Sequence, residues 1–264
     1  MRCICFFLAH GREPVDSVEL DRFVSRHMHD GVSAKNYVKT HAASYQLQEF
    51  FPQTRNAVYV YRHPLDVLCS ALDYSILIGE AGVDLSSAAE LEAWKKAWIA
   101  DYLESGAPPL WKDIHRTDSW NRNVESWLFD PLPFPVLGVA YEALLGQPHA
   151  TIRTIAEFLS LDVDDELVAA CERSTAFDRL RKMEDAEVEA AAEKGEPQGR
   201  FSVPARLPAL QQGLRFFNRG RAGAHLDMLD PAVITRGEQV FGEVAARLGY
   251  SLVARSAAAT AESQ

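Results

Sequence analysis

Short runs of apolar and aromatic residues stand out along a largely polar chain. Three of them, at residues 36–39, 57–61 and 135–139, are four or five residues long and are bounded by polar or turn-forming residues. A run without alternation is typical of a strand buried on both faces of a parallel sheet. The pattern therefore predicts three buried, parallel strands.

The stretches between and after these runs repeat apolar residues every three to four positions, which predicts amphipathic helices. One helix begins at Pro64, a residue suited to the first helical position, and another follows serines that suit an N-cap. The apolar positions are Leu65, Leu68, Leu72 and Ile76 in the first helix, Leu91, Trp94, Trp98 and Tyr102 in the second, Ile152, Ile155, Phe158 and Leu159 in a third at 149–161, and Val233, Val240, Phe241 and Val244 in a fourth at 231–248.

Strands that alternate with helices indicate an α/β fold with a central parallel sheet flanked by helices in three layers. We expect one domain over residues 1–250. The charged and then Pro- and Gly-rich stretch at 184–213 predicts a mobile connection or lid. The small polar residues at 251–264 predict a disordered tail.

Composition narrows the classes of function. The 264-residue chain has a formal net charge of −10, which argues against nonspecific nucleic-acid binding, since that binding needs a basic surface. An anionic ligand must then be held by a local cluster of cations and amides. The spacing of Cys3, Cys5, Cys69 and Cys171 does not resemble a metal site, and we expect buried free thiols.

The N-terminal segment does not change this interpretation. No apolar run approaches the ~20 residues of a membrane-spanning helix. Residues 1–14 contain an Arg and then a short apolar run, but no cleavage site of a signal peptide follows. We expect a cytoplasmic protein that binds neither membranes nor nucleic acid.

Polar residues with anion-binding chemistry follow two of the predicted strands. Residues 39–41 are Lys-Thr-His and residues 62–64 are Arg-His-Pro. Ligands of open α/β sheets collect at the carboxyl ends of the strands, where helix N-termini present unpaired amides. Taken alone, Arg62 could be a solvated charge and His41 a structural residue. Their recurrence at equivalent sheet positions favours one shared anion site.

Six short segments form an ordered series between about Lys39 and Leu248. They are "VKTH", "YVYRHPLDVLCSALDY", "SWNRNVESWL", "PVLGVAYEALLGQP", "CERSTAFDRLRKME" and "FFNRGRAGAHLDML". Each is a modest signal alone, but the series resembles the sulfotransferases that use 3′-phosphoadenosine 5′-phosphosulfate (PAPS). The resemblance implies a P-loop NTPase-like, three-layer fold and a cytosolic-type enzyme with 3′,5′-bisphosphoadenosine as its product and no metal.

The resemblance also implies the catalytic roles. His41 would be the general base that removes the proton of the acceptor hydroxyl, and an unperturbed pKa near ~6.5 leaves much of it neutral at pH 7. Lys39 lies two residues earlier, on the same side of a strand, and could stabilise charge on the sulfuryl or bridging oxygens. We expect an in-line displacement in which positioning and electrostatics dominate, by analogy with phosphoryl transfer.

The nucleotide-binding roles follow from the same resemblance. Arg62 would hold the 3′-phosphate bidentately, and Ser70 would share that phosphate, although its spacing from Pro64 alone does not support this role. Beside them, Tyr141 and Phe177 would border the adenine or could be core aromatics, and Thr175 would add a polar contact. The phosphate site would be completed by Arg219, Gly220, Arg221 and Gly223, a stretch that could also be an ordinary surface turn.

The chain departs from the family pattern at its start. Members open with a strand and a phosphate-cradling loop, and nothing similar precedes Lys39; residues 1–14 resemble the helix that should follow that loop. A start codon assigned too late would explain this, and so would a natural departure that binds nucleotide poorly. Further along, Ala143 replaces an Asp, and Ala-His-Leu at 224–226 stands where many members have Asp-Trp-Lys.

The leading hypothesis is therefore sulfuryl transfer from PAPS to a hydroxyl or amine of a small-molecule acceptor. The alternative is a noncatalytic, truncated relative that binds nucleotide or a partner protein. A nucleotide kinase is disfavoured because no Gly-x-x-x-x-Gly-Lys-Ser/Thr signature occurs. The acceptor pocket would draw on residues 76–109 and 185–212, and a homodimer stays open. The aromatic residues that would line this pocket or pack in the core are Trp94, Trp98, Trp111 and Trp120.

Overall fold

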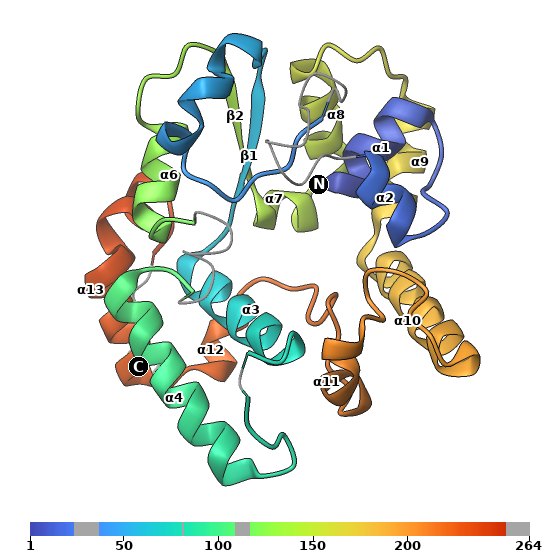
Figure 1. Ribbon diagram of the computed structural model, residues 1–264. Helices are drawn as coiled ribbons and strands as arrows, with labels where there is room; N and C mark the ends of the chain where they lie inside the picture. Colours follow the sequence, from blue (N-terminus) through green and yellow to red (C-terminus); the bar gives the residue numbers. More distant parts are fainter. Residues whose placement is uncertain (24–36, 81, 109–116, 252–264) are drawn as a thin grey trace, which may run out of the picture.

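The computed structural model describes residues 1–23, 37–80, 82–108 and 117–251. Two strands lie at the centre of the molecule, with helices on either side (Figure 1). In chain order the elements are α1 (Arg2–His10), α2 (Ser17–Phe23), the 3₁₀ segment η2 (Ser44–Gln53), β1 (Ala57–Tyr61), α3 (Pro64–Leu77), α4 (Ala88–Ser105), α6 (Trp120–Leu128), β2 (Val136–Ala140), α7 (Tyr141–Gly146), α8 (Pro148–Phe158), α9 (Asp165–Thr175), α10 (Phe177–Lys194), η3 (Pro204–Arg206), α11 (Leu207–Gln211), α12 (His225–Met228) and α13 (Pro231–Arg247).

The two strands pair in parallel. Their register joins Ala57 to Val136 at one end and Tyr61 to Ala140 at the other. Because both strands end at the same level, the residues that follow them, Arg62 and Tyr141, emerge side by side at the carboxyl edge. This edge is where the sequence predicts ligand binding.

Helices cover both faces of the sheet. Side chains alternate between the two faces of a strand, and Val58 accordingly packs with Val139 against a core formed by α1, α8 and α9. Tyr59 contributes to the opposite core, which α3, α4, α6 and α13 build around Leu65 and Phe241. The molecule is therefore the expected α/β protein, with a central parallel sheet between two layers of helices.

The four helices expected from their apolar spacing are confirmed as α3, α4, α8 and α13, each to within three residues at either end. The stripe of α3 is entirely buried, with Leu65 and Leu68 at 0% exposure. Gly237 of α13 lets that helix approach α3 closely, because a Cβ at this position would lie 2.5 Å from Leu65 Cδ2. The predicted stripes are thus core faces.

Two strand predictions need correction. In the segment predicted at 36–39, Asn36 lies outside the described residues, and within the rest only Val38 forms an isolated β-bridge. The apolar part of this run is too short to form a paired strand, because the charged Lys39 follows directly after Val38. The strand predicted at 135–139 is shifted by one residue, since proline has no N–H to donate and Pro135 contributes only its carbonyl, to Ala57 N at 3.1 Å.

The predicted mobile connection at 184–213 is wrong for its first half, which continues α10 to Lys194. Buried carboxylates explain the order. Glu184 is 0% exposed and accepts the backbone N–H groups of Phe216 and Phe217 at 2.6 and 2.8 Å. Glu187 accepts the N–H of Phe201 at 2.5 Å. The expected tail at 251–264 lies outside the described residues, except for Ser251.

Candidate functional site

A large cleft runs along β1 and past its carboxyl end. Its volume is about 2370 Å³, above the roughly 300–1000 Å³ of an ordinary small-molecule pocket, so it has room for two ligands. Among the described residues that line it, cations outnumber acids although the whole chain is acidic. The cations are Lys39, Arg55, Arg62, Arg200, Arg206, Arg215 and Arg219, and the acids are Asp66, Asp73, Asp118 and Glu172.

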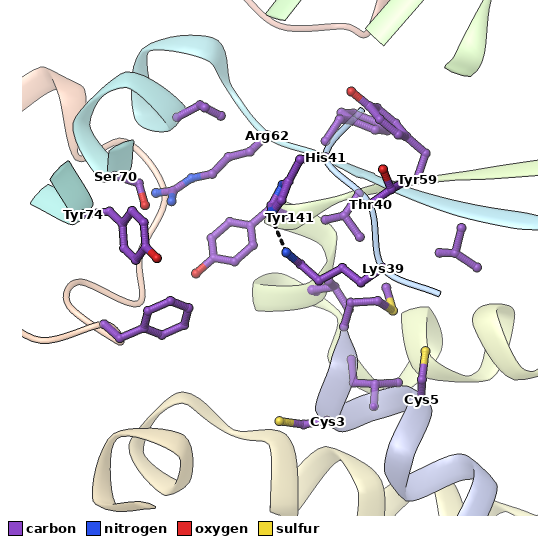
Figure 2. A pocket seen from close by; sticks show the side chains of 18 of the residues that line it. Cys3, Cys5, Lys39, Thr40, His41, Tyr59, Arg62, Ser70, Tyr74 and Tyr141 are labelled. Carbon is purple, nitrogen blue, oxygen red and sulfur yellow. Dashed lines mark hydrogen bonds between the residues drawn. The ribbon is translucent and has the colours of Figure 1, made fainter. Parts of the chain in front are cut away.

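Lys39 and His41 meet in this cleft. Figure 2 shows the Lys39 ammonium in a hydrogen bond to Nε2 of His41. An ammonium group only donates, so Nε2 accepts and carries no proton in this contact. The backbone is fixed by α6, where Asn123 Nδ2 donates to the His41 carbonyl at 3.0 Å and Trp127 Nε1 donates to the Ala42 carbonyl at 3.0 Å. The imidazole thus presents a proton-accepting nitrogen beside a cation.

Arg62 follows β1 and points into the same cleft (Figure 2). Its guanidinium lies 4.5 Å from the centre of the Tyr141 ring, as the register of the strands requires. Nη2 donates to the Arg221 carbonyl at 2.7 Å and lies 3.4 Å from Asp66 Oδ2. The Nε atom is buried and has no hydrogen-bond partner among the described residues. Arg62 therefore has donor capacity left for a ligand.

Ser70 lies on the exposed side of α3, two turns beyond Pro64, and lines the cleft. Its neighbour Cys69 is fully buried, so the helix turns the serine toward the ligand space. Figure 2 shows the Ser70 hydroxyl and the Arg62 guanidinium facing the same part of the cleft. Ser70 lies beyond the free amides of the first helical turn, but its side chain reaches the cleft without them.

Phe177 and Gly220 are brought into contact from segments 43 positions apart. Gly220 has φ 61°, and a Cβ there would lie 2.5 Å from the Phe177 ring. Only glycine combines this backbone conformation with so close an approach. Thr175 precedes Phe177 at the end of α9, lines the cleft and donates its hydroxyl to the Cys171 carbonyl at 2.7 Å.

The two predicted arginines of the late loop behave differently. Arg219 lines the cleft and makes a two-pronged contact with Asp73 of α3, at 2.9 and 3.2 Å. Arg221 is not among the residues that line the cleft, because its side chain pairs with Asp227 at 2.5 Å. Only its carbonyl takes part, as an acceptor for Arg62.

Sequence reasoning missed the group that holds this loop in place. Asp66 is 0% exposed and accepts the backbone N–H of Gly223 at 2.7 Å, that of His225 at 3.0 Å, and Nδ1 of His225 at 2.8 Å. Burial raises the pKa of this carboxyl, but these hydrogen bonds and the Arg62 charge outweigh it and hold the pKa well below its ordinary value. The only sequence signal was the position of Asp66 in the Arg-x-Pro-x-Asp segment.

Next to Asp66, two histidine rings stack. His63 occupies the N-cap position of α3 without a side-chain cap hydrogen bond, and its ring lies 4.1 Å from that of His225 at an interplanar angle of 5°. Its backbone N–H donates to Glu142 Oε1 at 3.1 Å. Burial and the neighbouring His225 lower the pKa of His63 to about 4, so its ring is neutral at pH 7.

The cysteines divide into two pairs. Cys69 and Cys171 are buried as expected, and burial raises the pKa of each thiol to about 12. Cys3 and Cys5 are only half-buried and line the cleft, because α1 borders it (Figure 2).

The described part of the chain contains no group of three or more His, Cys, Asp and Glu side chains that could hold a metal ion. No helix within it is long and apolar enough to cross a membrane. Of the expected acceptor-pocket tryptophans, Trp98 is buried in the core and Trp94 packs against it. Trp120 is buried in the same core and also lines the cleft, while Trp111 lies outside the described residues.

Comparison with solved structures identifies similar folds. A crystal structure of retinol dehydratase with androsterone and the inactive cofactor PAP has a TM-score of 0.55 and 19% identity, over 80% of this chain and 53% of that one. The retinol dehydratase complex with retinol and PAP gives 0.52 and 18%, over 81% and 54%. The mouse sulfotransferase SULT7A1 with PAP gives 0.51 and 18%, over 80% and 66%.

This chain therefore spans about half the length of retinol dehydratase, and no curated protein sequence matches it. At these identities the structures share a fold with it. The family model of the sulfotransferase domain matches residues 13–249, which includes both strands and every residue discussed at the cleft except those of α1. The chain belongs to the sulfotransferase domain family.

Proposed function

We propose that this protein transfers a sulfuryl group from PAPS to a hydroxyl, or an amine, of a small-molecule acceptor. The observation that carries the proposal is convergence. Lys39 and His41, Arg62 and Ser70, Phe177, and Gly220 come from four segments of the chain and line one cleft. PAP, the product of PAPS, was crystallised with each of the three structures of similar fold.

The residues of the cleft suit a bound nucleotide phosphate. The buried Nε of Arg62 lacks a partner among the described residues, and a donor left unsatisfied in this way costs about 1–3 kcal/mol. The absent side chain of Gly220 lets the Phe177 ring pack against its backbone at a left-handed turn that lines the cleft. An anionic nucleotide bound here would supply the partner that Arg62 Nε lacks.

Each expected binding residue then has a role. Arg62 and Ser70 would hold the 3′-phosphate, with Gly220 and Arg219 at its edge. The adenine would lie near Tyr141 and Phe177, with Thr175 as a polar neighbour, and Arg221 would act only through its carbonyl, by orienting Arg62. The nucleotide supplies the activated sulfuryl group; the protein supplies orientation and charge.

His41 would accept the proton of the acceptor hydroxyl at Nε2. That nitrogen is unprotonated in its contact with Lys39, so in the neutral ring the proton sits on Nδ1. The hydroxyl would replace the ammonium as donor to Nε2. Lys39, released from His41, would then be able to neutralise negative charge that develops on the transferred group, as positioned cations do in related displacements.

The experiment is transfer of ³⁵S-labelled sulfate from PAPS to a panel of phenols and alcohols, with the His41→Ala variant in parallel. We expect turnover to fall roughly 10²–10⁴-fold while the affinity for PAP, measured by calorimetry, is nearly unchanged. His149→Ala is the matched control, because His149 lies on α8 with 43% of its side chain exposed and is not among the residues that line the cleft.

Two results would contradict the proposal. Equal turnover of the His41→Ala and native proteins would show that His41 is not the general base. Binding of PAP without transfer to any acceptor would favour the noncatalytic alternative, in which the cleft only holds nucleotide.

A further inference from the structure

One wall of the cleft combines guanidinium groups with aromatic rings, and none of the roles above uses it. It consists of Arg200, Arg206, Phe201 and Phe216, all from the segment after α10, together with Tyr74 of α3; all five line the cleft. Figure 2 shows the Tyr74 ring entering the same cleft as Ser70 and Arg62.

Arg206 is the unusual member of this wall. It is only 6% exposed, and its hydrogen bonds go to neutral oxygens, the Arg200 carbonyl at 3.0 Å and the Tyr74 hydroxyl at 3.5 Å. Its Nε is buried and unpartnered among the described residues. A buried charge is normally paired, so this one calls for an anion.

Three other cations of the cleft form ion pairs with carboxylates of the chain. Arg62 lies 3.4 Å from Asp66, Arg219 lies 2.9 Å from Asp73, and Arg215 lies 2.8 Å from Asp185. No ion pair with a described carboxylate is formed by Arg206. Burial lowers its pKa and the Arg200 charge lowers it further, while Tyr74 and the charge of Glu184 oppose this shift without cancelling it. An anion beside Arg206 would therefore relieve both burial and repulsion.

The aromatic members define what else the ligand must carry. The Arg206 guanidinium lies 5.7 Å from the Tyr74 ring centre and 6.0 Å from that of Phe216. Tyr74 and Phe216 meet edge to face at 5.9 Å, and Phe201 lies 5.6 Å from Phe216. An apolar or aromatic body fits against these rings, with its charge at the guanidiniums.

We infer that the acceptor carries an anionic group, such as a carboxylate, on an aromatic or apolar body, and that Arg206 with Arg200 binds that group. This inference rests on the proposed function. The nucleotide is also anionic, but its expected residues are Arg62, Ser70, Phe177 and Gly220. The segment that holds Arg206 belongs instead to the region expected to shape the acceptor pocket.

The test compares phenolic acids with their methyl esters as acceptors: 4-hydroxybenzoate, 4-hydroxyphenylacetate and 3-(4-hydroxyphenyl)propanoate. We expect kcat/KM to favour the best-fitting acid over its ester by about 10–100-fold, the range of a charge-assisted hydrogen bond. Arg206→Gln should abolish this preference, because kcat/KM should fall more for the acid than for the ester. Arg236→Gln, at an exposed position of α13, should retain the preference.

Because Arg206 is buried, its replacement can unfold the protein, so Arg200→Gln and Arg206→Lys are made in parallel. Arg200→Gln should reduce the preference, and Arg206→Lys should retain part of it. Binding of each acid and ester to the PAP-loaded protein is also measured by calorimetry, which needs no turnover.

The outcomes separate this inference from the proposed function. Equal kcat/KM and equal affinity for acids and esters would overturn the inference while sulfuryl transfer stands. A loss of PAP affinity in Arg206→Gln with the acid preference intact would assign these arginines to the nucleotide and overturn it as well. If PAP does not bind, the proposed function fails, and acid binding to the protein alone, measured by saturation-transfer NMR, still decides whether the arginines hold an anion.

Discussion

Replacing His63 with phenylalanine should make the stability of this protein less sensitive to acid. The His63 ring is 7% exposed, and neither ring nitrogen has a hydrogen bond of normal geometry among the described residues. Burial and the stacked His225 ring lower its pKa to about 4, against the opposing influence of Asp66, Glu142 and the backbone of Ser251. Phenylalanine retains a flat ring for the stack and has no group to protonate.

The magnitude follows from linkage between protonation and folding. Above pH 6.5 His63 is neutral in both the folded and unfolded states and contributes nothing. As the pH falls below 6.5, His63 binds a proton in the unfolded chain but not in the folded protein, so the folded state loses stability. The loss levels off below pH 4, where His63 is protonated in both states. At pH 5 the difference between a pKa of about 4 and one of 6.5 corresponds to about 2 kcal/mol.

The assay is urea denaturation at pH 5, 6, 7 and 8, followed by tryptophan fluorescence. Native protein loses stability toward pH 5 through all its titrating groups, so the informative quantity is the gap between native and His63→Phe curves. That gap should grow by about 2 kcal/mol in favour of the variant from pH 7.5 to pH 5. His149→Phe, at an exposed position, controls for removal of a histidine. Parallel curves for native and His63→Phe would refute a buried, neutral His63.

Three further substitutions test the site. Arg62→Ala should weaken PAP binding in calorimetry by about 10–100-fold, since a charge-assisted contact is lost; equal affinity would remove Arg62 from the nucleotide site. Gly220→Ala should destabilise the protein in urea by more than Gly195→Ala. Both glycines have positive φ, so each variant should lose about 1–2 kcal/mol of unfolding free energy from backbone strain. Only at Gly220 would the added Cβ also clash with a ring, that of Phe177. Asp66→Asn should cost about 1–3 kcal/mol, because one backbone N–H loses its acceptor; unchanged hydrogen exchange at residue 223 would contradict this.

The helices could be predicted because their signal is local. The stripe from Leu65 to Ile76 repeats at helical spacing, and burial of that stripe is all that its position requires. The strand at 57–61 was also predictable, since its aromatic and β-branched residues suit a covered sheet. The strand predicted at 36–39 was wrong because a strand needs a hydrogen-bonded neighbour. A run of four residues contains no information on whether another strand will lie beside it.

The site was predictable only in part for a related reason. His41 and Lys39 are neighbours in the sequence, and the motif segments contain Arg62 and Ser70. The hydrogen bonds that hold the site together, however, join residues that are far apart in the sequence. Asp66 contacts the loop at His225 across 159 positions of chain. A buried carboxylate has no local signature, because the same residue in the first turn of a helix is ordinarily a solvated group that favours the helix dipole.

Glu184 and Glu187 are two more buried carboxylates without a local sequence signature, and they lie beside the wall of arginines and aromatic rings. In the sequence they belong to an acidic run that resembles a solvated, mobile segment, yet their spacing of three places both on one face of α10. That face accepts the backbone amides of Phe201 and Phe216, and the cost of burying the carboxylates is offset only when those amides are present. The arginine and aromatic wall is therefore fixed by α10. The anion binding proposed for it depends on two carboxylates that accept backbone N–H groups and form no ion pair with Arg206, although the charge of Glu184 raises the pKa of Arg206.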